Sequence, residues 1–126
     1  NIKKMCEILL KEFNGEVPKD FEKLVNLPGV GRKTANLVLS KAFNVPAIVV
    51  DTHMRRVSQR LGLTKNSDPE KIEYDLREIV PKDSWIIFSN LLIHHGKNTC
   101  KAQRPACNKC ALRNLCKFYE EKYLSL

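Results

Sequence analysis

Four cysteines within 17 residues near the end of the chain constrain the fold more than any other feature. Cys100, Cys107, Cys110 and Cys116 have the spacing C-x6-C-x2-C-x5-C. The segment that contains them is rich in Pro and Asn and has too few apolar residues to order itself, so it needs a bound group. Because the chain shows no secretory signal, a metal site is favoured over disulfides. The spacing alone leaves open a tetrahedral Zn²⁺ ion and a [4Fe–4S] cluster.

The rest of the composition is that of a globular protein. The chain has 126 residues, of which 43% are hydrophobic and 29% charged, and this argues against a disordered or fibrous chain. No apolar run approaches the length needed to cross a bilayer, so we expect no membrane partner. The fifth cysteine, Cys6, lies on an apolar helix face and is interpreted as a small core residue.

The charge is positive and unevenly distributed. A net charge of +8 favours a polyanionic partner. Between Ser84 and Tyr119 there are six Lys or Arg and no Asp or Glu. A run of charge is usually only a solvated surface. Its position around the cysteines favours a functional face, and four of the six basic residues lie within the cysteine segment: Lys101, Arg104, Lys109 and Arg113.

Apolar residues recur with helical period along almost the whole chain, which predicts an all-α fold. The expected helices cover residues 2–13, 21–25, 31–43, 52–61, 69–80 and 85–93, with 111–115 as the one helical stretch among the cysteines. The helix at 85–93 is apolar on most sides and is expected to be the most buried. Residues 47–50 have strand propensity but no partner strand, so we expect a buried extended segment there.

The turn LPGVGRKTA at residues 27–35 is a candidate phosphate site. Its two glycines, Gly29 and Gly31, can take positive φ and bring backbone close to a neighbour. The helix that follows begins with free N–H groups, which suit an anion. In a basic protein the natural anion is a DNA phosphate, whose contact positions the duplex without reading sequence. An ordinary turn between two helices is the alternative.

The turn at 27–35 together with the string VDTH at 50–53 resembles the endonuclease III branch of helix-hairpin-helix DNA glycosylases. The resemblance covers nearly all of this chain but only the C-terminal part of the family's chain. It implies a helix-hairpin-helix glycosylase fold that is incomplete at the N-terminus. Residues 1–44 would belong to the six-helix barrel domain, with the helix-hairpin-helix at 21–43, and residues 45–126 would form a helical iron–sulfur domain.

The resemblance also decides between the two metals. The spacing of the cysteines is similar to that of the family's C-terminal loop, which implies a [4Fe–4S] cluster held by Cys100, Cys107, Cys110 and Cys116 in the loop 100–116. Three basic side chains would then project from a rigid loop toward DNA phosphates: Lys101, Arg104 and Lys109.

Lys33 and Asp51 are the catalytic candidates. Lys33 lies in the first turn of a helix, where the helix dipole and the Arg32 guanidinium should lower the pKa of its amine and favour Schiff-base chemistry. An arbitrary lysine would be interpreted as a phosphate contact; the resemblance implies the catalytic lysine instead. Asp51 is expected to cap a helix by accepting a hydrogen bond from the N–H of residue 53 or 54. The resemblance implies that Asp51 also stabilises positive charge on the sugar and assists proton transfers.

The implied function is a bifunctional DNA glycosylase and AP lyase of base excision repair, acting on oxidised pyrimidines. Its partner is double-stranded DNA with damaged pyrimidines or AP sites. The expected DNA contacts outside the cysteine loop are Gly29, Val30, Gly31, Arg32 and His53. For His53, a contact with the strand opposite the lesion and a merely solvated position both stay open.

Two alternative functions remain open. One is a non-catalytic module in which the hairpin and the cluster loop only bind the DNA backbone. The other is a mismatch-specific glycosylase of the same superfamily, whose members are expected to lack a lysine at the position of Lys33. The expected protein is a cytoplasmic, nucleoid-associated monomer when full length. The missing N-terminal segment would come from the remainder of the chain or from a separate polypeptide.

Overall fold

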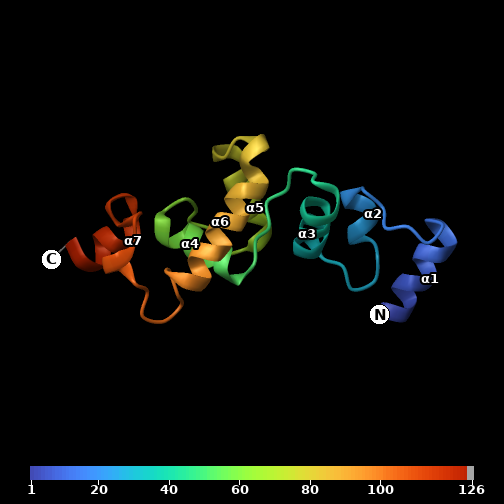
Figure 1. Cartoon of the computed structure of the whole chain (residues 1–126), viewed down its shortest axis with the longest axis horizontal. Coiled ribbons are helices and arrows are strands. Elements are labelled where there is room, and N and C mark those ends of the chain that lie inside the picture. Colours follow the sequence, from blue (N-terminus) through green and yellow to red (C-terminus); the bar gives the residue numbers. More distant parts are fainter. Residues whose placement is uncertain (125–126) are drawn as a thin grey trace. The chain divides into compact units, whose positions relative to one another are not determined.

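The computed structural model describes residues 1–124, and every regular element in that range is helical (Figure 1). The predicted all-α class is therefore confirmed. The helices are α1 (Ile2–Glu12), α2 (Phe21–Val25), α3 (Arg32–Phe43), α4 (Thr52–Leu61), α5 (Pro69–Ile79), α6 (Trp85–Asn98) and α7 (Lys117–Tyr119). The short 3-10 turns are η1 (Lys82–Ser84), η2 (Cys107–Lys109) and η3 (Arg113–Leu115), and the π-helical turn η4 covers Glu120–Leu124. No helix of the described range is long and apolar enough to cross a membrane.

The chain separates into two compact units, Asn1–Ala47 and Ile48–Leu126. The predicted division after Asn44 falls three residues before the observed one. The assignment of the first part to a six-helix barrel and of the second to a cluster domain stays a prediction. Each unit is described below by itself.

The first unit is built on the α2–α3 hairpin. Its buried apolar residues are Leu24, Leu27, Ala35 and Leu39. Helix α1 packs against this cluster through Met5, Ile8 and Leu9, which are partly buried. Cys6 is exposed, so the expectation that it is a small core residue is wrong. The helix stops are those that the sequence predicts: Asn14 and Gly15 have φ of 54° and 81° after α1, and Asn44 ends α3 in the left-handed region.

The second unit has its core between α4, α5 and α6. The buried apolar residues are Ile48, Val50, Met54, Val57, Ile72, Leu76, Trp85 and Leu92. Residues 48–50, at the start of this unit, are buried and form neither helix nor strand, in agreement with the expected buried segment without a partner strand. A side chain takes the place of the missing partner strand, since the Ser89 hydroxyl accepts the Val49 N–H at 3.2 Å.

Helices α4 and α6 lie side by side, and a glycine makes their contact possible. A Cβ atom added at Gly96 would lie 3.0 Å from both the Cβ of His53 and the Cγ2 of Val57. Such distances are below ordinary van der Waals contact, so a larger residue would force the two helices apart.

Helix α6 differs from its prediction in length and burial. It runs to Asn98 instead of residue 93, and Ile87 and Leu91 are each 59% exposed. The expectation that this helix is the most buried is wrong, because only one face of it meets α4. Helix α4 contributes Met54 and Val57, both at 0% exposure. Residues 111–115 also differ, with a 3-10 turn instead of an α-helix.

Candidate functional site

The hairpin between α2 and α3 depends on one glycine for its conformation. Gly29 has φ of +81°, a value that L residues with a Cβ rarely adopt. Gly31 has φ of −98° and an extended backbone, so the expectation of positive φ is confirmed at Gly29 and wrong at Gly31. A backbone bond closes the turn, from the Val30 N–H to the Leu27 carbonyl at 3.1 Å. A Cβ added at Gly31 would meet nothing within 4 Å, and the turn is open to an approaching molecule there.

Gly31 is also the residue that precedes α3, and this N-terminus is open. Within residues 1–124, no side chain caps it. The Arg32 guanidinium lies over the Phe21 ring at 4.7 Å, and the side chains of Lys33 and Thr34 are exposed. An anion could therefore reach the first backbone N–H groups of α3, where the side chains of Arg32, Lys33 and Thr34 would surround it.

The two predicted catalytic residues lie at the starts of different helices. Lys33 is the second residue of α3, in the unit of residues 1–47. Asp51 precedes α4, in the unit of residues 48–126, and is half-buried. Its Oδ1 accepts the Met54 N–H at 2.8 Å, which confirms the predicted cap. The catalytic roles of both residues stay predictions.

His53 is held by an arginine that the sequence analysis did not single out. The Nη2 atom of Arg56 lies 3.2 Å from His53 Nδ1 and donates to the Gly96 carbonyl at 2.7 Å. Its Nε donates to the Cys100 carbonyl at 3.1 Å. Because a guanidinium has only donors, His53 Nδ1 is the acceptor in this contact. Arg56 thus joins His53 to the first cysteine of the cysteine segment.

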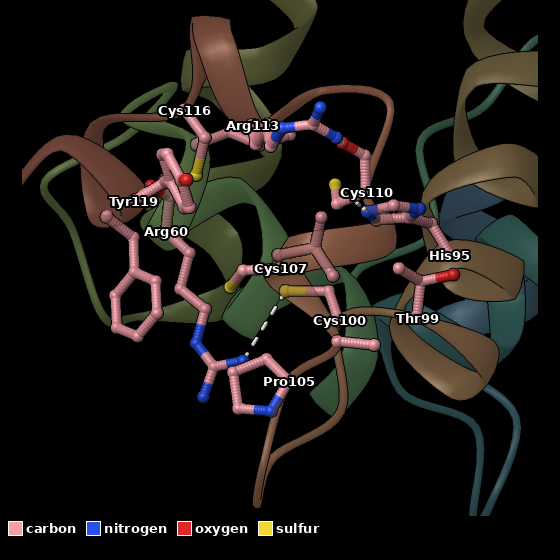
Figure 2. A pocket seen from close by; sticks show the side chains of 14 residues that line it. Arg60, His95, Thr99, Cys100, Pro105, Cys107, Cys110, Arg113, Cys116 and Tyr119 are labelled. Carbon is pink, nitrogen blue, oxygen red and sulfur yellow. Dashed lines mark hydrogen bonds between the residues drawn. The ribbon is translucent and has the colours of Figure 1, made fainter. Parts of the chain in front are cut away.

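The four predicted metal ligands lie around one cavity at the end of the second unit. All four thiols are free, half-buried and in its lining, as Figure 2 shows. Two nitrogen groups approach the sulfurs: Arg60 Nη1 lies 3.4 Å from Cys100 Sγ, and His95 Nε2 lies 3.6 Å from Cys110 Sγ. Burial, followed by the nearby His94 charge, lowers the pKa of His95, so this imidazole is neutral at physiological pH.

The donor set fits an iron–sulfur cluster. Four thiolates with N–H donors to sulfur are the ordinary surroundings of such a cluster. Within the described range, no three His, Cys, Asp or Glu side chains are grouped so as to hold a metal ion. The cysteine ligands and the cofactor therefore stay predictions that depend on the shared cavity and the thiol chemistry.

Three of the four basic residues of the cysteine segment are exposed and do not line the cavity. Lys101, Arg104 and Lys109 are exposed, and Arg104 has an unusual φ of +52° for a residue with a side chain. The loop that carries Arg104 is closed by a bond from the Ala106 N–H to the Thr99 carbonyl at 2.9 Å. These side chains are available to a phosphate backbone, and their DNA contacts stay predictions.

Sequence reasoning missed Arg56, Arg60 and Gly96. The partners of both arginines lie about 40 residues away in the sequence, so no local pattern identifies them. Their spacing of four residues on one helix could have shown that they share a face. Gly96 lies beyond residue 93, where the expected helix ended, so nothing in the predicted pattern indicated a close helix contact there.

Comparison with known proteins identifies the family of the chain. A family model described as the HhH-GPD superfamily of base excision DNA repair proteins matches residues 1–82. Endonuclease III of Synechocystis is 50% identical over 117 residues, which cover 92% of this chain and 53% of the relative. Endonuclease III of Escherichia coli is 46% identical over 121 residues, covering 96% and 57%. The chain thus spans somewhat more than half the length of these relatives.

Solved structures show the same similarity. A trapped endonuclease III–DNA covalent intermediate matches with a TM-score of 0.91 and 48% identity, over 95% of this chain and 57% of that one. A thermostable thymine-DNA glycosylase matches with a TM-score of 0.79 and 28% identity over the same shares. The chain therefore belongs to the HhH-GPD superfamily of base excision DNA repair proteins, and its predicted resemblance to the endonuclease III family is confirmed.

Proposed function

We propose that this chain carries the chemistry of a base-excision DNA glycosylase that also cuts the strand as an AP lyase, with oxidised pyrimidines in duplex DNA as substrates. The observation that carries the proposal is Lys33. Its amine stands exposed in the first turn of α3, beside a hairpin whose backbone is open to a phosphate. Support comes from the similarity to an endonuclease III chain that was trapped as a covalent intermediate with DNA.

In the proposed reaction, the damaged nucleotide is first extruded from the duplex. The Lys33 amine attacks C1′ of the deoxyribose, and the C1′–N bond breaks as the base leaves with its electron pair. The sugar ring opens to an imine between C1′ and the lysine nitrogen. Loss of a C2′ proton then breaks the C3′–O bond by β-elimination, and water hydrolyses the imine to release Lys33.

Asp51 serves this reaction through its charge. A carboxylate near the sugar stabilises the positive charge that develops at C1′ and accepts protons during the later steps. The hydrogen bond from Met54 N–H fixes one oxygen of the carboxylate, so the group is oriented before substrate arrives. Capping and catalysis are compatible roles for a single carboxylate.

Docking of DNA is assigned to backbone and basic groups. The hairpin residues Gly29, Val30, Gly31 and Arg32 would receive a phosphate, and His53 would contact the duplex. The exposed side chains of Lys101, Arg104 and Lys109 would add sequence-independent attraction.

For the cysteine cavity we propose a [4Fe–4S] cluster with Cys100, Cys107, Cys110 and Cys116 as ligands. When bound, the cluster supplies cross-links between distant parts of a segment that has no core. The expected protein is yellow-brown, absorbs near ~400 nm, and contains iron and sulfide in equal amounts. Stoichiometric zinc without iron in protein prepared anaerobically would refute the assignment.

Borohydride trapping on AP-site DNA tests the proposed activity. The wild-type protein should form a covalent adduct, and Lys33→Gln should not, while its DNA affinity stays within about tenfold of wild type. Asp51→Asn keeps an oxygen for the cap and should slow base release at least about a hundredfold. An adduct of normal yield with Lys33→Gln would show that the nucleophile is wrong.

A mismatch-specific glycosylase is the second candidate, favoured by the similarity to a thymine-DNA glycosylase. It would release the mismatched base without forming an imine. The same experiment separates the two, because a glycosylase without the lyase step leaves no borohydride adduct. Binding of DNA with neither release of an oxidised or mismatched base nor an adduct on AP-site DNA would favour the non-catalytic module.

A further inference from the structure

Arg60, in the last turn of α4, contacts the beginning of the cysteine segment with both terminal nitrogens of its guanidinium. Nη1 donates to the Lys101 carbonyl at 2.7 Å, and Nη2 donates to the Ala102 carbonyl at 3.0 Å. Nη1 also lies 3.4 Å from Cys100 Sγ, as Figure 2 shows. The guanidinium is planar, and its two terminal nitrogens form a fork that donates to two successive carbonyls. This fork fixes both the position and the direction of the backbone at residues 101 and 102.

The same residue also contacts the end of the segment. The guanidinium carbon lies 4.8 Å from the centre of the Phe118 ring, a cation–π contact. The Arg60 carbonyl accepts a hydrogen bond from the Cys116 thiol at 3.4 Å. Arg60 therefore joins residues 100–102 to residues 116–118.

The segment between these two ends has no buried residue of its own. No residue from Cys100 to Cys116 is buried, and the turns η2 and η3 contain only local backbone bonds. Other elements contact it through Arg56 at the Cys100 carbonyl, through His95 at Cys110, and through the core of the second unit, against which the Cys100 side chain packs. Each of these contacts involves one place in the segment, whereas the contacts of Arg60 involve both of its ends.

The charge of Arg60 suits what the cavity would hold. Four thiolates and a cluster carry net negative charge in a half-buried site, and a guanidinium keeps its positive charge at every physiological pH. An N–H donor to a ligand sulfur withdraws electron density from it, which raises the reduction potential of the cluster.

We propose that Arg60 is a positioning residue for the cluster, which holds both ends of the cysteine segment in the ligating arrangement and donates an N–H to the Cys100 sulfur. This inference rests on the proposed [4Fe–4S] site and deepens it, because it names the side chain that organises the ligands.

Three variants of the full protein test the inference. Arg60→Gln removes the fork and the charge. Arg60→Lys keeps the charge but has a single donor atom, so it cannot bond two carbonyls in the same way. Arg55→Gln is the matched control, since Arg55 is exposed and lies on the same helix with the same charge. Each variant is purified anaerobically beside wild type.

The first measurement is the rate at which the absorbance near ~400 nm bleaches in air. We expect Arg60→Gln to lose its cluster about 10- to 100-fold faster than wild type and Arg55→Gln to match wild type. The second measurement is the midpoint potential, which should fall in Arg60→Gln and stay closer to wild type in Arg60→Lys. Amide exchange in α4 and α6 verifies that the variants are folded.

The outcomes separate this inference from the function on which it rests. No iron in wild type overturns the cluster and the role of Arg60 together, whereas loss of borohydride trapping alone overturns only the lyase. Iron-loaded Arg60→Gln with the bleaching rate and potential of wild type overturns the inference. Should Arg60→Gln fail to fold, Arg60→Lys decides, because bleaching at the wild-type rate would show that the fork is not needed.

Discussion

The hairpin at residues 27–35 and the cysteine segment at residues 100–116 are both loops that present backbone and basic groups, but they are held in opposite ways. The hairpin is fixed from within by a turn bond, one glycine of positive φ and the buried side chains of Leu27 and Ala35. The cysteine segment buries no residue and is held by side chains of α4 and α6. A loop with its own core keeps its shape without ligand, whereas one without a core depends on outside contacts.

Removal of iron should produce the largest difference in amide protection between the two loops. After chelation and mild oxidation, amide protection in residues 100–116 should fall at least about a hundredfold, because the ligand cross-links are lost. Protection in α3 should not change. Hydrogen exchange followed by mass spectrometry measures both loops in one sample. Equal loss in both, or no loss in either, would contradict the comparison.

Helices α4 and α6 provide the side chains that contact the cysteine segment, so their packing against each other should affect it. Gly96→Ala would place a methyl group 3.0 Å from His53 Cβ and Val57 Cγ2 and 3.2 Å from Arg56 Nη2. We expect a loss of about 1–3 kcal/mol in the free energy of unfolding, measured with urea. Faster cluster loss should accompany it, because Arg56 also contacts the Cys100 carbonyl. A variant as stable as wild type would show that the helices separate without cost.

Substitution of Gly29 and of Gly31 in the hairpin should affect different properties: stability in the first case and DNA affinity in the second. Gly29→Ala forces a Cβ into positive φ and should cost about 1–2 kcal/mol of stability. Gly31→Ala meets open space at an ordinary φ, so its stability should stay within about 0.5 kcal/mol of wild type. Its DNA affinity should nevertheless fall, because the new methyl group occupies the path of an approaching phosphate. Urea unfolding and fluorescence anisotropy with duplex DNA measure these effects, and the reverse order of stabilities would contradict the geometry.

A small effect is expected in acid, from a carboxyl group at Asp75 in α5. Hydrogen bonds from Thr64 and then from Asn66 lower the pKa of Asp75 from its ordinary value of 3.8. A depressed folded pKa adds stability above the unfolded pKa, and this stability is lost as pH falls through the folded value. Thr64→Val should therefore be less stable than wild type at pH 7, with the difference shrinking below about pH 4. A difference that grows in acid would reverse the assignment.

The sequence predicts the fold better than it predicts the site. Helix starts and stops follow local chemistry, so the cap at Asp51 and the positive-φ residues Asn14 and Gly15 after α1 are found where they are expected. Burial of α6 was misjudged because apolar residues on all sides do not reveal which face meets a neighbour. Arg60 was missed for a related reason, since its partners lie 41 and 42 residues away.

The most direct test of the account is to locate the covalent bond to DNA. Borohydride-trapped protein on AP-site DNA is digested with nuclease and trypsin, and the modified peptide is sequenced by tandem mass spectrometry. The account predicts the reduced sugar remnant on the Nζ atom of Lys33, in the first turn of α3. A remnant on another lysine or on an amino terminus, with Lys33 unmodified, would contradict it.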